Sequence, residues 1–440
     1  MQRDLTQGPI RRGLILFSLP LIAGNLLQQL YNIVDTWVVG RFLGNVALAA
    51  VGSAFSLMVL LTSLLLGLCM GSGVVFSQLH GEGRPDRMKT AVVNAFVMIA
   101  LIALLLTVLS YAALPALLSL MRIPPEVVSD ITAYLRVVFA GIPFVFLYNF
   151  LAAVLRSVGN SLAPLLFLLV STLANIVLDL LFVLGLHAGV AGAAAATVMA
   201  QALSAVGIAL CFLRMTALHP GKAHMRRDGA LLARIASVSV LTSVQQSIMN
   251  FGILMIQSLV NSFGVANMAA FAAGVKIDAF AYSPAQDFAN GFATFVAQNT
   301  GAGKPDRVRR GLREAGALSL SFCLLVSALV FLFAKPLLTL FIDPAETEIL
   351  AIGARYLRLE GVFYVGIGML FLLYATYRGL ERAGMSVVLT VISLGLRVLI
   401  AYAFAPRFGV TAIWLAIPIG WFVADAVGLF GLVRAWQKGG

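Results

Sequence analysis

The chain has 440 residues, of which 61% are hydrophobic and 11% are charged, and its mean hydropathy is +0.99. Soluble domains are about half apolar and about a quarter charged, so this composition excludes a soluble globular protein and indicates a chain surrounded by lipid. The formal net charge of +12 does not indicate a nucleic-acid-binding protein, because most basic residues gather in short loops between long apolar runs.

Twelve apolar segments follow one another along the chain, each long enough for a transmembrane helix of about 20 residues. They are continuously apolar rather than alternating, which excludes a β-barrel. The basic N-terminus MQRDLTQGPIRR is interpreted as a cytoplasmic lead-in rather than a signal peptide, because the apolar run is too long and no small-residue cleavage site follows. We therefore predict an all-α integral membrane protein with twelve spans. They lie near residues 14–40, 46–78, 90–116, 131–155, 162–186, 189–213, 234–260, 266–298, 314–340, 352–377, 384–405 and 408–433.

The basic residues are divided unequally between the two sides of the membrane. If the spans alternate in direction, 21 of the 30 Lys and Arg residues fall on the side of the two termini. The positive-inside rule assigns that side to the cytoplasm. The pattern predicts a multi-pass protein of a prokaryotic-type inner membrane with both termini cytoplasmic.

The second half of the chain repeats the first. GEGRPDRMK at 81–89 matches GAGKPDRVR at 301–309, an offset of 220, and a neighbouring offset of 222 pairs Arg156 with Arg378. Six spans per copy is an even number, so the copies should be parallel repeats related by an axis along the membrane normal. We predict an N-lobe at 1–213, a cytoplasmic linker at 214–233 and a C-lobe at 234–440. Two such lobes around a central cleft are typical of an alternating-access carrier.

One carboxylate interrupts the first span. An ionised Asp at the bilayer centre costs about 2.5–3.5 kcal/mol, so Asp35 should face a cavity or a partner. Pro20 lies several turns earlier and removes a backbone hydrogen bond, which makes it a candidate hinge. Residues three or four apart share a helix face. The polar face that this spacing predicts consists of Asn25, Gln28, Asn32 and Asp35, with Tyr31 beside it.

The fifth span carries a second acidic position. Asn175 and Asp179 are four residues apart and should share a face, and Thr197 follows the small-residue run GAAAA, which permits close helix approach. Burial and mutual repulsion favour the protonated form of a carboxyl group, and hard oxygen ligands also suit a small cation. Together with Asp35, this group is a candidate site for H⁺ or Na⁺. The alternative is that both acids are simply buried and satisfied by polar neighbours.

Several motifs together resemble the multidrug and toxic compound extrusion (MATE) family. They are NIVDTWVVGRFLGNVALAAVG at 32–52, the loops GEGRPDR and GAGKPDR, and NIVLDLLFV followed by GVAGAAAAT across the fifth and sixth spans. The resemblance covers nearly the whole chain and implies exchange of organic cations for H⁺ or Na⁺. In the DinF-like branch, acids on the first and fifth spans form the N-lobe proton or cation site. Asp35 and Asp179 match those positions, with Asn175 and Thr197 as neighbours.

The second copy lacks these acids. At the 220 offset Asp35 becomes Met255, Asp179 becomes Leu399 and Asn175 becomes Gly395, so ion coupling is expected in the first lobe. NorM-like members of the family carry acids on the seventh and tenth spans. Here those spans have no acid at mid-depth, only Glu360 near a predicted end, so a NorM-style Na⁺ site is not expected.

Other charged and aromatic residues in the spans have two interpretations. Charged residues of the second lobe can form neutralising pairs, or can contact substrate. Aromatic and Met side chains can line a permissive pocket for flat organic cations, or pack against neighbours. The charged residues are Lys276, Asp278, Asp287, Arg397 and Asp425, and the candidate substrate-cleft residues are Gln28, Tyr31, Asn32, Met249, Tyr282 and Asp287.

The sequence contains no sign of an enzyme or of a bound cofactor. The glycine loops lack the GK[ST] ending of a P-loop, and no nucleophile–base pair or Cys cluster is present. We therefore predict an ion-coupled exporter of amphipathic, cationic organic compounds or drugs that acts as a monomer in the lipid bilayer. A lipid-linked saccharide flippase of related fold is the alternative.

Overall fold

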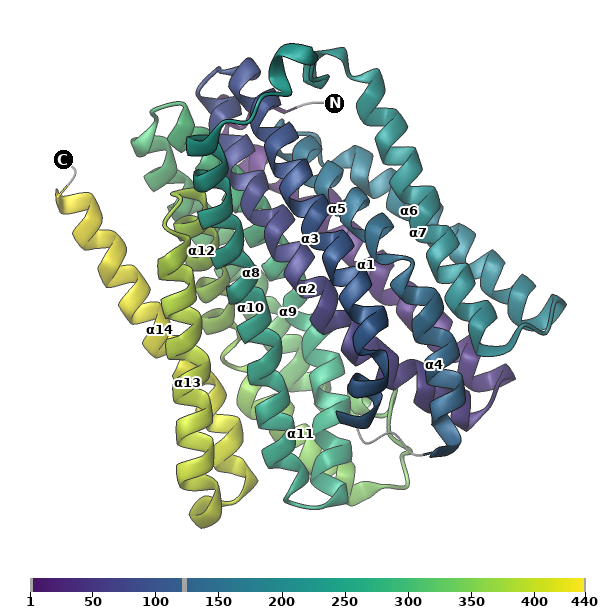
Figure 1. Cartoon of the computed structure of the whole chain (residues 1–440). Coiled ribbons are helices and arrows are strands. Elements are labelled where there is room, and N and C mark those ends of the chain that lie inside the picture. Colours follow the sequence, from purple (N-terminus) through teal and green to yellow (C-terminus); the bar gives the residue numbers. More distant parts are fainter. Residues whose placement is uncertain (1–2, 121–124, 439–440) are drawn as a thin grey trace. The chain divides into compact units, whose positions relative to one another are not determined.

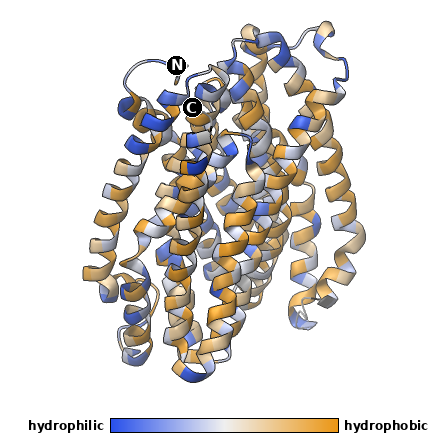
Figure 2. Ribbon diagram, turned by 90° about the vertical axis from the view of Figure 1, so that its left-hand side faces the viewer, coloured by the Kyte–Doolittle hydropathy of each residue, from blue (hydrophilic) through white to orange (hydrophobic). Residues whose placement is uncertain are grey.

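A computed structural model describes residues 3–120 and 125–438 of the chain, and within them every regular element is a helix (Figure 1). Apolar residues cover the helices along their length, and hydrophilic residues gather at their ends (Figure 2). The all-helical, membrane-spanning fold predicted from the sequence is confirmed. The first half comprises α1 (Ile10–Phe42), α2 (Asn45–Gly81), α3 (Pro85–Leu120), α4 (Pro125–Phe139), α5 (Ile142–Ser157), α6 (Leu162–Leu180), the π-helix η1 (Leu181–Gly185) and α7 (Gly189–Arg214).

The linker and the second half repeat this order. Two short 3₁₀-helices, η2 (Thr216–Leu218) and η3 (Lys222–His224), lie in the linker. The helices that follow are α8 (Gly229–Asn261), α9 (Val265–Gly301), α10 (Pro305–Leu338), α11 (Thr347–Gly361), α12 (Tyr364–Gly379), α13 (Ala383–Phe408) and α14 (Val410–Lys438).

Two of the twelve predicted spans are broken helices. Among the described residues nine helices are long and apolar enough to cross a membrane, and two bent pairs bring the number to eleven. The bends are 43° between α4 and α5 and 51° between α11 and α12. At the first bend a proline stands in the opening turn of α5, where its missing N–H costs least. The remaining predicted span, 266–298, is α9, a 37-residue helix that carries Lys276, Asp278 and Asp287 and is not among these eleven.

The described chain forms two compact units. Unit 1 comprises residues 23–243 and the first residues of the chain, and unit 2 comprises residues 5–22 and 244–438. In unit 1, α2 packs on α3, α4 and α5, while α7 packs on α4, α5 and α6. In unit 2, α9 packs on α10, α11 and α12, and α13 packs along α14. The predicted lobe boundaries differ from these units, because the start of α1 packs within unit 2 and the start of α8 packs within unit 1.

Glycines permit the close packing of α8 on α2 in unit 1. A Cβ atom on Gly67 would lie 2.3 Å from Ser243 Cα, and one on Gly71 would lie 2.4 Å from Ser239 Cα. The hydroxyls of Ser72 and Ser239 are 2.9 Å apart and buried. The two backbones therefore approach as closely as small residues allow, a contact typical of membrane helices.

The repeat is visible in backbone geometry, with a register change that the sequence indicated at Arg156 and Arg378 but that the predicted pairing of the fifth span did not include. Gly44 and Gly264 both precede a helix at positive φ, 87° and 95°, which keeps the offset of 220. The broken spans are offset by 222, since α5 starts at residue 142 and α12 at residue 364. Gly189 and Gly409, both at positive φ, are again offset by 220 residues. The fifth span is thus two residues longer in the first copy, and the π-helix η1 lies within it.

This register corrects two predicted correspondences. Gly159 and Glu381, both at positive φ just before this span in each copy, are 222 residues apart, so the counterpart of Asn175 on α6 is Arg397 rather than Gly395. By the same offset Tyr134 on α4 corresponds to Tyr356 on α11. The counterpart of Asp179 becomes Ala401, so the second copy still lacks an acid at that position.

Candidate functional site

The structure brings the two predicted carboxylates together inside unit 1. Asp35 of α1 is 7% exposed and Asp179 of α6 is fully buried, and their carboxyl groups lie within hydrogen-bonding reach of each other. Ionised carboxylates only accept hydrogen bonds, so a direct bond between the two requires a proton on one of them. Without a proton or another cation, two negative charges would face each other in apolar surroundings, which is strongly unfavourable.

Polar neighbours predicted from the sequence surround this acid pair. Asn175 lies one turn before Asp179 on α6 and is 2% exposed, and Thr197 of α7 is 6% exposed. The Tyr31 hydroxyl donates a hydrogen bond of 3.4 Å to Thr197 Oγ1. Five predicted residues from three helices therefore form one buried cluster, named here the acid-pair site: Tyr31, Asp35, Asn175, Asp179 and Thr197.

Helix packing holds α6 and α7 in this register. The Ser171 hydroxyl donates a 2.7 Å hydrogen bond to the Ala200 carbonyl, one turn from Asn175 on α6 and one turn from Thr197 on α7. Ala193 and Ala196 are fully buried, so the small residues of α7 lie on its packed face. The predicted role of the GAAAA run in close helix approach agrees with this packing.

Several oxygens of the acid-pair site lack protein donors. Among the described residues, Asp35 Oδ1, both carboxyl oxygens of Asp179 and Asn175 Oδ1 are buried without a hydrogen-bond donor, and Asn175 Nδ2 is buried without an acceptor. Buried polar atoms are normally paired, so unpaired oxygens at one place indicate an additional species. Carboxylate, amide and hydroxyl oxygens suit H⁺ or a hard cation such as Na⁺. The described residues contain no cluster of three or more His, Cys, Asp or Glu side chains of the kind that binds a transition metal.

The candidate hinge lies where α1 passes from one unit to the other. Pro20 is inside α1, and the boundary between the units follows Ile22. Before the boundary α1 packs on α9, because a Cβ on Gly291 would meet Ser18 Oγ at 2.4 Å. After it, Gly24 lies against Leu168 of α6. The helix that carries Asp35 is therefore anchored in both units.

The remaining predicted substrate residues lie at separate places. Gln28 is exposed and Asn32 is half-buried on α1, outside the buried cluster. In unit 2, Met249 and Tyr282 line one cavity of about 190 Å³. Asp287 of α9 is half-buried and is not among the residues that line this cavity.

Two buried polar residues differ from the sequence-based prediction, which did not include Tyr134 and placed Glu360 near the end of a span. Tyr134 of α4 is 7% exposed and interacts electrostatically with Asp35 and Asp179, so it borders the acid-pair site. Glu360 is 3% exposed and ends α11 at the break in its span. The sequence placed Glu360 near a membrane surface because the span was predicted as one straight helix that begins at residue 352. In the structure the span begins at Thr347, with the first residue of α11, and Glu360 therefore lies in its interior.

Asp278 was predicted to form a neutralising pair with a basic residue or to contact substrate. It accepts hydrogen bonds from the hydroxyls of Tyr356, at 2.5 Å, and Tyr364. Lys276 lies over the Phe341 ring at 5.6 Å. Among the described residues, Asp278, Arg397 and Asp425 take part in none of the ion pairs found, so tyrosine hydroxyls rather than a paired cation hold Asp278.

Comparison with known proteins identifies the class of this chain. The family model for MatE matches residues 20–181 and 242–403, one match in each half. The probable multidrug resistance protein YpnP of Bacillus subtilis is 30% identical over 397 residues, covering 89% of this chain and 87% of that protein. An FAD transporter of Shewanella oneidensis is 27% identical over 434 residues, covering 95% and 93%. The crystal structure of MATE in the bent conformation has a TM-score of 0.92 at 26% identity and covers 99% of this chain and 98% of that one.

The chain is therefore a polytopic membrane transporter built from two copies of one helical repeat. It belongs to the MATE family, as its sequence motifs predicted. Members of this family are transporters rather than enzymes, and curated relatives are named multidrug resistance or export proteins.

Proposed function

We propose that the protein exports amphipathic organic cations in exchange for H⁺ or Na⁺, with the acid-pair site as the ion-coupling site. The observation that carries the proposal is the contact of Asp35 with Asp179, together with their unpaired buried oxygens. A buried pair of carboxylates is unstable without a positive charge. It therefore favours exchange of one cation for another over an empty state.

Competition at this site is sufficient for antiport. When H⁺ or Na⁺ occupies the carboxylates, the attraction for an organic cation falls, and binding of the organic cation disfavours the small ion. Oxygens of Asp35, Asp179, Asn175 and Thr197 would hold Na⁺ where Na⁺ is the coupling ion. One charge moving across 100 mV supplies about 2.3 kcal/mol, enough for roughly fiftyfold accumulation.

Helix α1 supplies a mechanical link for alternating access. It carries Asp35 in unit 1 and is anchored on α9 in unit 2, with Pro20 close to the boundary. A change of charge at Asp35 would alter how the second part of α1 packs, and Pro20 would let that part bend separately.

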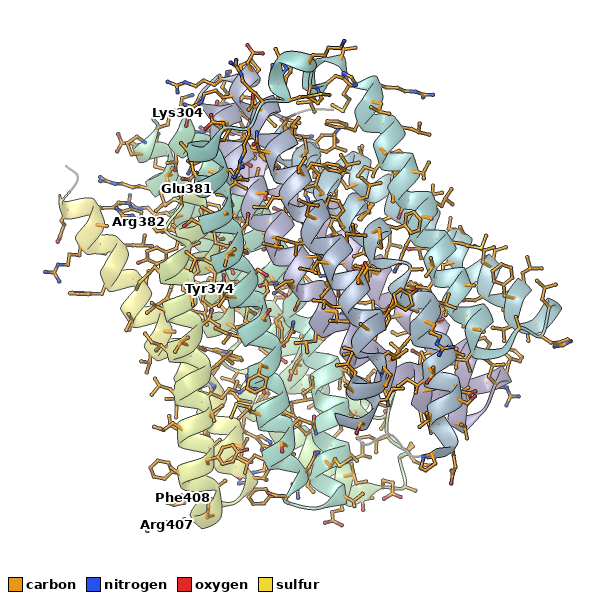
Figure 3. The ribbon with its side chains drawn as sticks, viewed as in Figure 1. Lys304, Tyr374, Glu381, Arg382, Arg407 and Phe408 are labelled. Carbon is orange, nitrogen blue, oxygen red and sulfur yellow. The ribbon has the colours of Figure 1, made fainter. Side chains whose placement is uncertain are left out.

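The distribution of charge supports a cytoplasmic location of the basic loops. In unit 2, Lys304, Glu381 and Arg382 lie at one end, while Arg407 and Phe408 lie at the other end of α13 (Figure 3). The basic loops after α2 and α9 share the side of both termini under the alternating order of spans. We propose a prokaryotic inner membrane and cytoplasmic termini on this basis.

Dye efflux from cells tests the proposal. Cells expressing the wild-type chain should retain less ethidium than cells with Asp35→Asn or Asp179→Asn, whose level should match cells without the protein. Asp86→Asn, which changes an exposed carboxylate of unit 1, is the matched control and should leave efflux unchanged. Efflux that survives both neutral substitutions would refute the role of the acid pair. One relative is named an FAD transporter, so FAD released by the same cells is measured as well. Release of FAD without efflux of ethidium would indicate an anionic cargo rather than a cationic one.

A further inference from the structure

Unit 2 contains a second polar cavity whose charges differ from those of the acid-pair site. Its volume is about 190 Å³, and α8, α9, α11, α12, α13 and α14 all contribute to its lining. Tyr374, which lies between the two ends of unit 2 in Figure 3, is part of its wall. The residues that carry the argument are Asp278, Tyr282, Tyr356, Glu360, Arg397 and Trp421.

One wall of this cavity is acidic. Asp278 is 2% exposed, and both of its carboxyl oxygens accept hydrogen bonds, one from Tyr356 and one from Tyr364. Glu360 is equally buried, but its Oε2 atom has no hydrogen-bond donor among the described residues. The two acids come from different helices, α9 and α11, and interact electrostatically with each other. Glu360 also interacts with Tyr356, and its Oε2 atom is the acidic oxygen of this wall that is left without a donor in the described chain.

Arg397 of α13 provides a basic group in the same cavity. Its guanidinium interacts electrostatically with Asp278 and Glu360 but forms none of the ion pairs found among the described residues. The Arg397 Nε atom is buried without an acceptor in the described part of the chain. An unsatisfied buried donor is unfavourable, and a guanidinium is suited to bind a carboxylate with two parallel hydrogen bonds.

Aromatic side chains form another part of the wall. Tyr282 and Phe371 are in ring contact at 6.1 Å between centroids, and Trp421 and Tyr374 also line the cavity. An apolar cavity of about 150 Å³ is large enough for benzene, so this cavity can hold one aromatic ring with short substituents. Ring faces and edges of this kind favour a flat ligand.

We propose that this cavity binds a small aromatic zwitterion, with its ammonium group at Glu360 and its carboxylate at Arg397. The ligand would give partners to Glu360 Oε2 and Arg397 Nε, the two atoms of the lining residues left without one in the described part of the chain, and Asp278 would stay fixed by its two tyrosines. Arg397 is the counterpart of Asn175 in the repeat, and Tyr356 is the counterpart of Tyr134. Corresponding places in the two copies therefore carry different charges, acidic in unit 1 and mixed in unit 2. The proposal goes beyond cation export and does not depend on it.

Three ligands with one ring test the charge requirement. Isothermal titration of the purified full-length protein uses para-aminomethylbenzoic acid as the zwitterion, benzylamine as the cation and benzoate as the anion. The zwitterion should bind at least about tenfold more tightly than either analogue, because each lacks one charge-assisted contact. Equal or tighter binding of benzylamine would overturn the proposal, and so would no measurable binding of the zwitterion.

Substitutions then assign each charge. Arg397→Gln should reduce the affinity for the zwitterion to that for benzylamine and leave the affinity for benzylamine unchanged. Glu360→Gln should reduce the affinity for the zwitterion to that for benzoate. Asp35→Asn lies in unit 1 and should leave zwitterion binding intact even where efflux is lost, which separates this proposal from the proposed function. Unchanged zwitterion affinity in folded Arg397→Gln would refute the site. If that variant does not fold, the comparison of the three ligands on the wild-type chain decides the question.

Discussion

A single methyl group on α2 should destabilise unit 1. Gly71→Ala would place a Cβ atom 2.4 Å from Ser239 Cα and 2.8 Å from both Ser239 N and Val238 O. Carbon atoms in contact are about 3.5–4.0 Å apart, so the two backbones must separate by about 1 Å. All three clashing atoms belong to the backbone, and no change of side-chain rotamer relieves them.

The cost can be worked out from these contacts. Overpacking costs about 1–3 kcal/mol. Separation of the helices also weakens the buried hydrogen bond between Ser72 and Ser239, worth about 0.5–1.5 kcal/mol. The better helix propensity of Ala returns about 0.5–1 kcal/mol. The net expectation for Gly71→Ala is a destabilisation of about 2 kcal/mol.

Thermal melting of the detergent-solubilised protein measures this effect. Gly52→Ala on the same helix is the matched control, because no atom lies within 4 Å of its added Cβ, and it should melt at or slightly above the wild-type temperature. Gly71→Ala should melt clearly below both. If the two variants melt together, α2 and α8 are not in the close contact described here, and the reasoning fails.

Three further predictions follow from individual contacts. Tyr364→Phe removes a donor from buried Asp278 and should destabilise the protein by about 1–3 kcal/mol, seen as a lower melting temperature. Asn94→Ala removes two of the hydrogen bonds that hold the end of the linker on α3, so trypsin should cut the linker faster. Thr90→Ala should leave the cleavage rate unchanged, and equal rates in the two variants would contradict the proposed role of Asn94. Gly44→Ala forces an L-residue to φ 87° and should lower the melting temperature by an amount equivalent to about 1–2 kcal/mol; a higher melting temperature would contradict that backbone geometry.

Much of the fold could be predicted because lipid imposes simple requirements on sequence. Continuous apolar runs identify the spans, and all twelve predicted segments are helical in the described chain. The polar spacing on the first and fifth spans also predicted that Asp35 and Asp179 would face inward. Helix periodicity assigns a residue to a face, and burial of both acids agrees with that assignment.

The breaks within spans could not be predicted from hydropathy, because a bent helix is as apolar as a straight one. This omission hid Glu360, whose interior position depends on where α11 starts and ends. The two-residue change of register around η1 was also not visible in the loop motifs, which keep the offset of 220. Its effect was to pair Asn175 with Gly395, and so to conceal that Arg397 occupies the corresponding place. Contacts between distant helices, such as Tyr134 beside the acid pair, depend on packing that one sequence does not specify.

Transport in proteoliposomes with a pH gradient and a Na⁺ gradient imposed separately tests the central claim most directly. Wild-type protein should move a fluorescent organic cation against its concentration gradient under one of the two, because a site that exchanges cations converts that gradient into export. Asp35→Asn and Asp179→Asn should each abolish this gradient-driven movement, since one remaining carboxylate lacks the partner that makes exchange obligatory. Gradient-driven transport that persists at the wild-type rate in both variants would show that coupling occurs elsewhere in the chain.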